Sequence, residues 1–185
     1  MSSGGLESYL VPLQANLFVS TTGLVSTEVE GIDGVIDSGE YTGTSITASN
    51  TDKNTNVEVK GKVVEGDIYL AFTITHGEWS SYDNGVDNWW KNDNIEMYVN
   101  GQKIVILFIN GELVLPSYIT QGKMVTTTNS DGKLVSVVEL YIQGDANSYD
   151  LKIGMNGKGF SWVGVMWQEG TTSVGTISAS GIAKN

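Results

Sequence analysis

The sequence contains no cysteine and no arginine, and it has one histidine and two prolines. Without cysteine, the chain forms no disulfide and carries no thiol nucleophile, so its stability must come from a hydrophobic core. The lack of cysteine fits an extracellular bacterial protein as well as a cytosolic one, and it therefore does not locate the chain.

Long apolar runs are also missing from the sequence. No stretch approaches the ~18 apolar residues that a membrane-spanning helix needs, and the first residues lack a basic segment followed by an apolar run. We therefore expect a soluble chain that does not insert into a membrane. Glycine, in contrast, is abundant at 23 residues, and Asn, Ser and Thr are frequent, which is typical of a turn-rich β protein.

The charges are strongly unbalanced. Ten lysines stand against 21 acidic residues, which gives a net charge of −11. A chain with this charge repels phosphate backbones and anionic membrane surfaces, which argues against nucleic acid as a partner. A surface that offers hydroxyl and amide groups more than charge suits neutral polyhydroxylated ligands.

Alternation of apolar and polar residues predicts about ten short strands. Residues 41–48, 56–64 and 68–76 alternate in this way, and the continuous apolar run at 103–109 predicts a strand buried on both faces. Asn100-Gly101 and similar turn sequences separate the strands. No stretch carries a sustained helical stripe, so the sequence predicts an all-β fold, a two-sheet antiparallel β-sandwich that is jelly-roll-like.

The N-terminal part differs from the rest of the chain because its apolar residues follow no sustained period. We expect an N-terminal arm or linker over residues 1–27 and one sandwich domain over residues 28–185. The extended apolar segment at 15–19 can add a strand to an open sheet edge of this domain or of a neighbouring subunit. The arm is thus a candidate link to a larger parent protein or assembly.

The stretch Asp87–Asn100 concentrates the residues with functional chemistry. Trp89 and Trp90 lie in an Asn/Asp-rich loop that runs directly into an amphipathic strand. Tryptophan in a polar loop is poorly placed for a core, and an indole stacks well on flat, weakly polar ligands. The stretch therefore predicts a binding platform carried on a sheet. Because adjacent residues of an extended chain point in opposite directions, we expect one of the two rings to be packed.

Four segments of the chain together span residues 31 to about 182. They are Ile32-Asp33-Gly34 with Glu40-Tyr41, Asp67 to Phe72, Trp90 to Tyr98, and the late strand ending in Val165-Met166-Trp167. In their order and spacing these segments resemble family 9-type carbohydrate-binding modules and the wider group of DOMON-like sandwiches. The resemblance implies a β-sandwich that binds oligo- or polysaccharides without catalysis, at an extracellular or cell-surface location.

The resemblance also implies roles for particular residues. In such modules an aromatic residue before the strand stacks on the sugar, and a glutamate of the strand accepts hydrogen bonds from sugar hydroxyls. These roles fall to Trp90 and Glu96, with Trp89 as the alternative ring. An indole and a carboxylate must lie close together to serve one sugar in this way.

The other tryptophans have different expectations. Trp167 and Trp79 lie near strand ends, where loops gather, and are further candidate ligand contacts. Trp162 is expected in the core. Family members commonly place a second stacking tryptophan in the loop after the late strand, but residues 168–173 contain none, and arginine is absent. These departures favour a flatter or weaker site.

An acidic run offers a second kind of site. Asp83, Asp87 and Asp93 supply oxygen ligands of the kind that Ca²⁺ requires, without the fixed spacing of an EF-hand. A structural calcium ion at these residues is therefore a hypothesis. The alternative is a solvated loop.

A catalytic function is not expected. The chain has no Gly-x-Ser-x-Gly motif and no glycine-rich phosphate loop between a strand and a helix. Some jelly-roll glycosidases use two carboxylates at close alternating positions of one strand, but neither residue 94 nor residue 98 beside Glu96 is acidic. Glu139 is a distant second carboxylate, and a single glutamate on a strand is usually at the surface.

Two alternatives to sugar binding stay open at this point. DOMON-like relatives ligate haem iron with Met and His, for which His76 is the one imidazole, although a lone His at the end of an apolar face is more often packed or hydrogen-bonded. The other alternative is a structural or adhesive domain of a surface layer or virion. An exposed Trp89 or Trp90 beside Glu96 on a concave face favours binding, whereas two rings packed under loops favour the scaffold.

Overall fold

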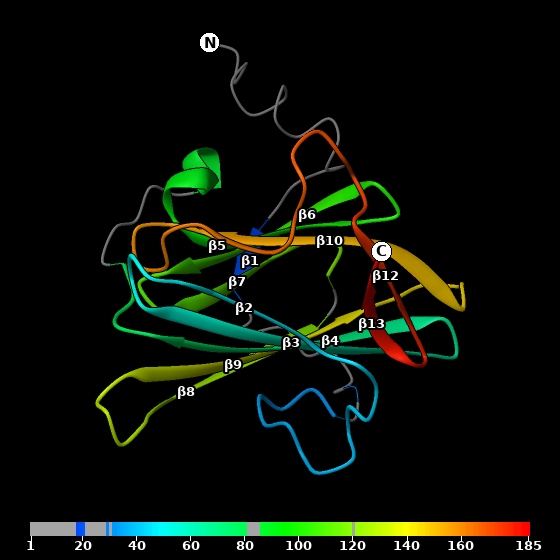
Figure 1. Cartoon of the computed structure of the whole chain (residues 1–185), viewed down its shortest axis with the longest axis horizontal. Helices are drawn as coiled ribbons and strands as arrows, with labels where there is room; N and C mark the ends of the chain where they lie inside the picture. Colours follow the sequence, from blue (N-terminus) through cyan, green and yellow to red (C-terminus); the bar gives the residue numbers. More distant parts are fainter. Residues whose placement is uncertain (1–17, 21–28, 30, 81–85, 120) are drawn as a thin grey trace.

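The computed structural model describes residues 18–20, 29, 31–80, 86–119 and 121–185, with the backbone alone at 18–20 and 86–87. Within this part, the chain forms two sheets of antiparallel strand pairs that pack face to face (Figure 1). The predicted two-sheet β-sandwich is thereby confirmed. Among the described residues, no helix is long and apolar enough to cross a membrane.

The first sheet has eight strands and contains the stretch that the sequence singled out. Seven strands follow one another in the order β1-β7-β6-β5-β10-β12-β13, and β11 pairs with β10 beside β12. The strands are β1 (Phe18–Ser20), β5 (Asp93–Val99), β6 (Gln102–Ile109), β7 (Glu112–Pro116), β10 (Ser148–Asn156), β11 (Val163–Met166), β12 (Gly175–Ser178) and β13 (Gly181–Lys184).

The second sheet has five strands in the order β2-β3-β4-β9-β8. A short 3₁₀ helix, η1 (Val86–Lys91), precedes β5 on the outer side of the eight-stranded sheet (Figure 1). The strands of the second sheet are β2 (Ile46–Asn50), β3 (Thr55–Val64), β4 (Asp67–His76), β8 (Gln121–Thr128) and β9 (Leu134–Ile142).

The hydrophobic pattern accounts for the way the strands pack. Alternate residues of β3 and β5 are buried between the sheets, whereas residues 104–108 of β6 are all buried, as the continuous apolar run predicted. The core contains large, fully buried side chains of both sheets, among them Phe72, Phe108 and Leu140. Burying each such side chain contributes about 1.5–3 kcal/mol.

Part of the N-terminal arm is described. Residues 18–20 form β1, which pairs antiparallel with β7 at the edge of the eight-stranded sheet. The arm therefore adds a strand to the sheet of its own chain at this point, one of the two options that the sequence left open. Residues 1–17 and 21–28 lie outside the described residues.

Glu139 is buried, which corrects the expectation that it lies at the surface. It stands on the outer face of the five-stranded sheet, where the segment 31–41 covers it (Figure 1). Its Oε2 accepts hydrogen bonds from the N–H groups of Asp33 (3.0 Å) and Gly34 (2.8 Å), and the Tyr41 hydroxyl donates to Oε1 (3.0 Å). Burial raises the pKa of Glu139, while the hydrogen bond from the Gly34 N–H opposes the rise.

His76 is also fully buried, at the end of β4. Its Nε2 lies 3.0 Å from the Ser136 hydroxyl, and its ring packs edge-on against Trp79 (4.5 Å between centroids) and Phe160 (5.3 Å). The imidazole is therefore packed and hydrogen-bonded, which is the alternative to haem ligation given above. Burial lowers the pKa of His76 below its ordinary value.

This burial predicts a pH dependence of stability. Below pH ~6.5 His76 becomes protonated in the unfolded chain but stays neutral in the folded chain. The free energy of unfolding should therefore fall by up to ~1.4 kcal/mol for each unit by which the pH decreases. Urea unfolding at stepped pH measures this loss, and His76→Gln should show a weaker dependence in that window. The raised pKa values of Asp93 and Glu139 act in the opposite direction but in both proteins alike. Equal slopes for the two proteins would contradict the prediction.

Candidate functional site

The outer face of the eight-stranded sheet brings together aromatic and charged side chains. Because Ile95, Met97 and Val99 of β5 point into the core, the alternating residues Glu96 and Tyr98 point outward. We call the set of residues on and around this surface the aromatic face. Its members are Trp89, Trp90, Glu96, Tyr98, Lys103, Lys152, Trp162 and Trp167.

The strand register sets the centre of the aromatic face. Glu96 pairs with Gly154 of β10, and Tyr98 lies between Lys103 of β6 and Lys152 of β10. Since paired residues of neighbouring strands place their side chains on the same face, these groups all belong to the outer surface. One carboxylate and two ammonium groups thus lie at the centre of the face.

Trp89 and Trp90 lie on the β6 side of Glu96. The Lys103 ammonium lies 4.3 Å from the centroid of the Trp89 ring, and it also forms an ion pair with Glu96 Oε1 (2.8 Å). Trp90 meets Trp89 edge-on and is 38% exposed. Trp89 is partly buried against Lys103 and Trp90, so Trp90 is the more exposed of the two rings.

The 3₁₀ helix η1 explains why both rings reach this face. It ends immediately before β5, where the Asn92 N–H donates to the Trp89 carbonyl (3.1 Å). Asn88 has non-helical backbone angles, so the turn is kinked just before the two tryptophans. A tight polar turn thus holds the rings beside the outward face of β5.

Trp162 and Trp167 lie on the other side of Glu96, at the two ends of β11. Their rings meet edge-on with 5.0 Å between centroids. Both rings lie over Gly154, since a Cβ atom on this glycine would stand 2.6 Å from Trp162 Cη2 and 2.8 Å from Trp167 Cε3. Gly154 therefore leaves the space in which the two indoles lie, directly beside Glu96.

The expectation that Trp162 is a core residue is wrong, because its side chain is 43% exposed. Trp162 would face the core together with Phe160 if the alternation of the late strand extended back to residue 160. The strand begins at Val163, however, and the preceding Ser161 has a positive φ of 59°. A left-handed residue breaks the extended alternation, so Trp162 turns outward while Phe160 stays buried.

Lys152 links the two halves of the aromatic face. It is 4% exposed, and its ammonium lies 3.8 Å from the Trp167 ring centroid and 5.1 Å from that of Tyr98. The ammonium also donates a hydrogen bond to the carbonyl of Thr171, in the loop between β11 and β12. These contacts hold Trp167, one of the candidate ligand contacts, in its orientation.

Glu96 keeps acceptor capacity in this setting. It is an ion-pair partner of Lys103 and accepts a long hydrogen bond from the Tyr98 hydroxyl (3.4 Å). A carboxylate has about four acceptor sites, so these two contacts do not exhaust it. The arrangement can therefore stack a flat ligand on an indole and accept hydrogen bonds from its donors.

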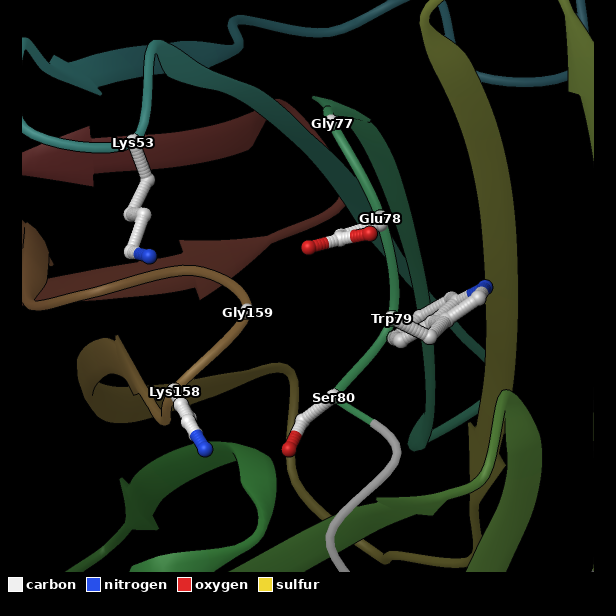
Figure 2. Close-up of a pocket in the computed structure, with 7 residues that line it drawn as sticks. All are labelled: Lys53, Gly77, Glu78, Trp79, Ser80, Lys158 and Gly159. Atoms are coloured by element: carbon white, nitrogen blue, oxygen red, sulfur yellow. The ribbon is translucent and has the colours of Figure 1, made fainter.

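Trp79 lies apart from the aromatic face. Its ring packs against His76, Phe108 and Phe160, with centroids 4.5, 4.8 and 5.3 Å away. It contributes to a pocket of about 550 Å³ whose other lining residues are Lys53, Gly77, Glu78, Ser80, Lys158 and Gly159. Figure 2 shows the Trp79 ring pointing away from the two lysines. The pocket therefore offers no freely presented ring.

Asp93 holds the walls of this pocket together. It is fully buried, its Oδ2 accepts the Ser80 N–H (2.8 Å), and its Oδ1 accepts the Gly159 N–H (2.7 Å). Burial raises the pKa of Asp93, and these backbone hydrogen bonds oppose the rise. Asp93 thus joins the loop after β4 to the loop after β10, with one carboxylate oxygen bound to each loop.

The calcium hypothesis is not tested by these contacts. Asp83 lies outside the described residues, and the side chain of Asp87 is not described. In the part of the chain that the structure describes, no group of three or more His, Cys, Asp or Glu side chains could hold a metal ion. A site that includes Asp83 and Asp87 with Asp93 stays a prediction.

Comparison with known proteins shows the fold. No family model and no curated protein matches the chain. It is similar to a carbohydrate-binding module of family 9 from Caldicellulosiruptor kristjanssonii in complex with cellotriose (TM-score 0.53, 12% identity, 83% of this chain and 89% of that one). The same similarity holds for a family 9 module of that organism in complex with glucose (TM-score 0.53, 15% identity, 83% and 93%). The chain therefore has a family 9-type β-sandwich fold, as the sequence resemblance implied.

Proposed function

We propose that this chain is a non-catalytic module that binds carbohydrate on its aromatic face. The observation that carries the proposal is the position of Glu96 between two tryptophan pairs, each of which has one exposed ring: Trp90 at 38% and Trp162 at 43%. A sugar ring has apolar C–H faces and hydroxyl groups at its edge. The indoles can stack on the former while Glu96 accepts hydrogen bonds from the latter.

The second tryptophan pair changes the kind of site that the sequence suggested. The loop over residues 168–173 contains no stacking ring, but Trp162 and Trp167 occupy the ends of the neighbouring strand. With one exposed ring on each side of the Glu96 carboxylate, the face can stack on more than one sugar unit. We therefore propose a short oligosaccharide, rather than a monosaccharide, as the preferred ligand.

Ligand choice starts from the proteins with the same fold. The two similar modules were solved with cellotriose and with glucose, so cellotriose is the first ligand to test here. Polymeric glycans occur mainly at and outside the cell surface, and an extracellular or cell-surface location is part of this proposal. The scaffold alternative required both Trp89 and Trp90 to be packed, and the exposure of Trp90 favours binding instead.

The role of Glu96 can be tested with a single-atom change. Glu96→Gln should weaken cellotriose binding about tenfold, because a hydrogen bond to a charged acceptor contributes ~1.5–3 kcal/mol and the amide replaces one acceptor oxygen by a donor. Isothermal titration calorimetry gives the dissociation constants. Glu112→Gln, at an exposed position of β7, is the matched control and should bind like the parent. Equal affinities for Glu96→Gln and the parent would exclude Glu96 from the site, and no heat with any glycan would refute the function.

A further inference from the structure

The aromatic face has a surplus positive charge, although the whole chain has a net charge of −11. Lys103 is neutralised by Glu96, and the other ion pair among the described residues joins Lys60 to Glu58. Lys152 belongs to neither pair. Asp150 lies two residues before it on the same side of β10, but its exposed carboxylate forms no ion pair with Lys152. The centre of the face therefore holds an ammonium group that no described carboxylate neutralises.

Burial makes this charge significant. Lys152 is 4% exposed, and an ammonium withdrawn from water without a counter-charge is unfavourable. Its hydrogen bond to the Thr171 carbonyl and its positions over the Trp167 and Tyr98 rings compensate part of this cost. Carbonyls and ring faces carry no net charge, however, and the site stays electrostatically incomplete.

We propose that the aromatic face selects an acidic saccharide, whose carboxylate forms an ion pair with the Lys152 ammonium. This inference rests on the proposed function of the face. In a uronic acid the carboxylate projects from the edge of the sugar ring, so the ring can stack on the exposed Trp162 while the acid group lies toward Lys152. Low-dielectric surroundings strengthen this attraction relative to water.

The rest of the face is compatible with such a ligand. Glu96 would repel an acid group if its charge were free, but Lys103 neutralises it at 2.8 Å. The strongly negative chain as a whole repels polyanions at long range. The ligand class that meets both conditions is a mainly neutral oligosaccharide with a single uronic acid, rather than a polyuronate.

A matched pair of ligands tests the inference. The first is xylotriose that carries one glucuronic acid branch, and the second is the same oligosaccharide with its carboxyl group reduced to a primary alcohol. Calorimetry at low salt should show the acid bound about tenfold more tightly than the reduced form. Lys152→Met, which removes the charge and keeps most of the length of the side chain, should abolish the difference. Lys60→Met, on the outer face of the other sheet, should leave it unchanged.

The outcomes separate this inference from the proposed function. If the parent protein binds both oligosaccharides equally well, the face binds sugar but does not select an acid, and the inference is overturned. If neither binds, and cellotriose does not bind, the proposed function itself fails. A salt titration of the parent protein covers the case in which Lys152→Met does not fold. Preference for the acid should then decline as salt rises, and a preference that salt does not change would overturn the charge argument.

Discussion

Replacing Trp90 or Trp162 with alanine is expected to weaken cellotriose binding by about thirtyfold, which corresponds to ~2 kcal/mol. Both rings are exposed on the aromatic face, and each stands beside a partner ring that keeps it in place. An exposed ring that already has a fixed orientation loses little conformational freedom when a sugar stacks on it. Removing the ring therefore costs contact area with the sugar, and little conformational entropy of binding is regained to offset this loss.

The control for this prediction is Trp79→Phe. Trp79 packs in the aromatic cluster with Phe108 and Phe160, so its replacement should lower the free energy of unfolding and leave the dissociation constant unchanged. Trp90→Ala and Trp162→Ala should show the reverse, since their exposed rings contribute little to the core. If Trp90→Ala and Trp162→Ala lower the stability but leave the affinity for cellotriose unchanged, the scaffold alternative is supported.

Glu139→Ala is expected to destabilise the fold by about 4 kcal/mol, because it leaves two buried donors and one partly buried donor without a partner. The carboxylate accepts the N–H groups of Asp33 and Gly34 and the Tyr41 hydroxyl. Burial and the adjacent carboxylate raise the pKa of Tyr41, so its hydroxyl stays a donor throughout the neutral range. The segment 31–41 would then lose its main attachment to the five-stranded sheet.

Urea unfolding measures this loss, and hydrogen exchange locates it. The amides of Asp33 and Gly34 should exchange much faster in Glu139→Ala than in the parent protein. Glu139→Gln, which keeps one acceptor oxygen, should lose an intermediate amount of stability, and Glu112→Ala at an exposed position should lose little. A loss below ~1 kcal/mol for Glu139→Ala would show that water replaces the carboxylate at this point.

Strand positions could be predicted from the sequence where alternation continues through the whole strand. The expected strands at 56–64 and 68–76 correspond closely to β3 and β4. The expected strand at 41–48 begins only at Ile46, because Tyr41 instead directs its hydroxyl to Glu139. Long-range contacts of this kind leave no local signal in the sequence.

Half of the candidate site was visible in the sequence, and the other half depended on strand register. Trp90 and Glu96 share one loop and strand, so their proximity follows from local order. That Glu96 lies beside Gly154 follows from the pairing of β5 with β10, which alternation cannot specify. Trp162 was missed for a local reason, the positive φ of Ser161, and a Ser-Trp pair after Gly159-Phe160 does not reveal it.

The indole N–H signals of the five tryptophans provide the most direct test of sugar binding at the aromatic face. In ¹⁵N-labelled protein titrated with cellotriose, the signals of Trp90 and Trp162 should shift saturably with one dissociation constant. The signal of Trp79, which lines the pocket with Lys53 and Lys158, should not move. A shift of the Trp79 signal with those of Trp90 and Trp162 unchanged would place sugar binding at that pocket instead. No shift of any indole with any glycan would contradict carbohydrate binding.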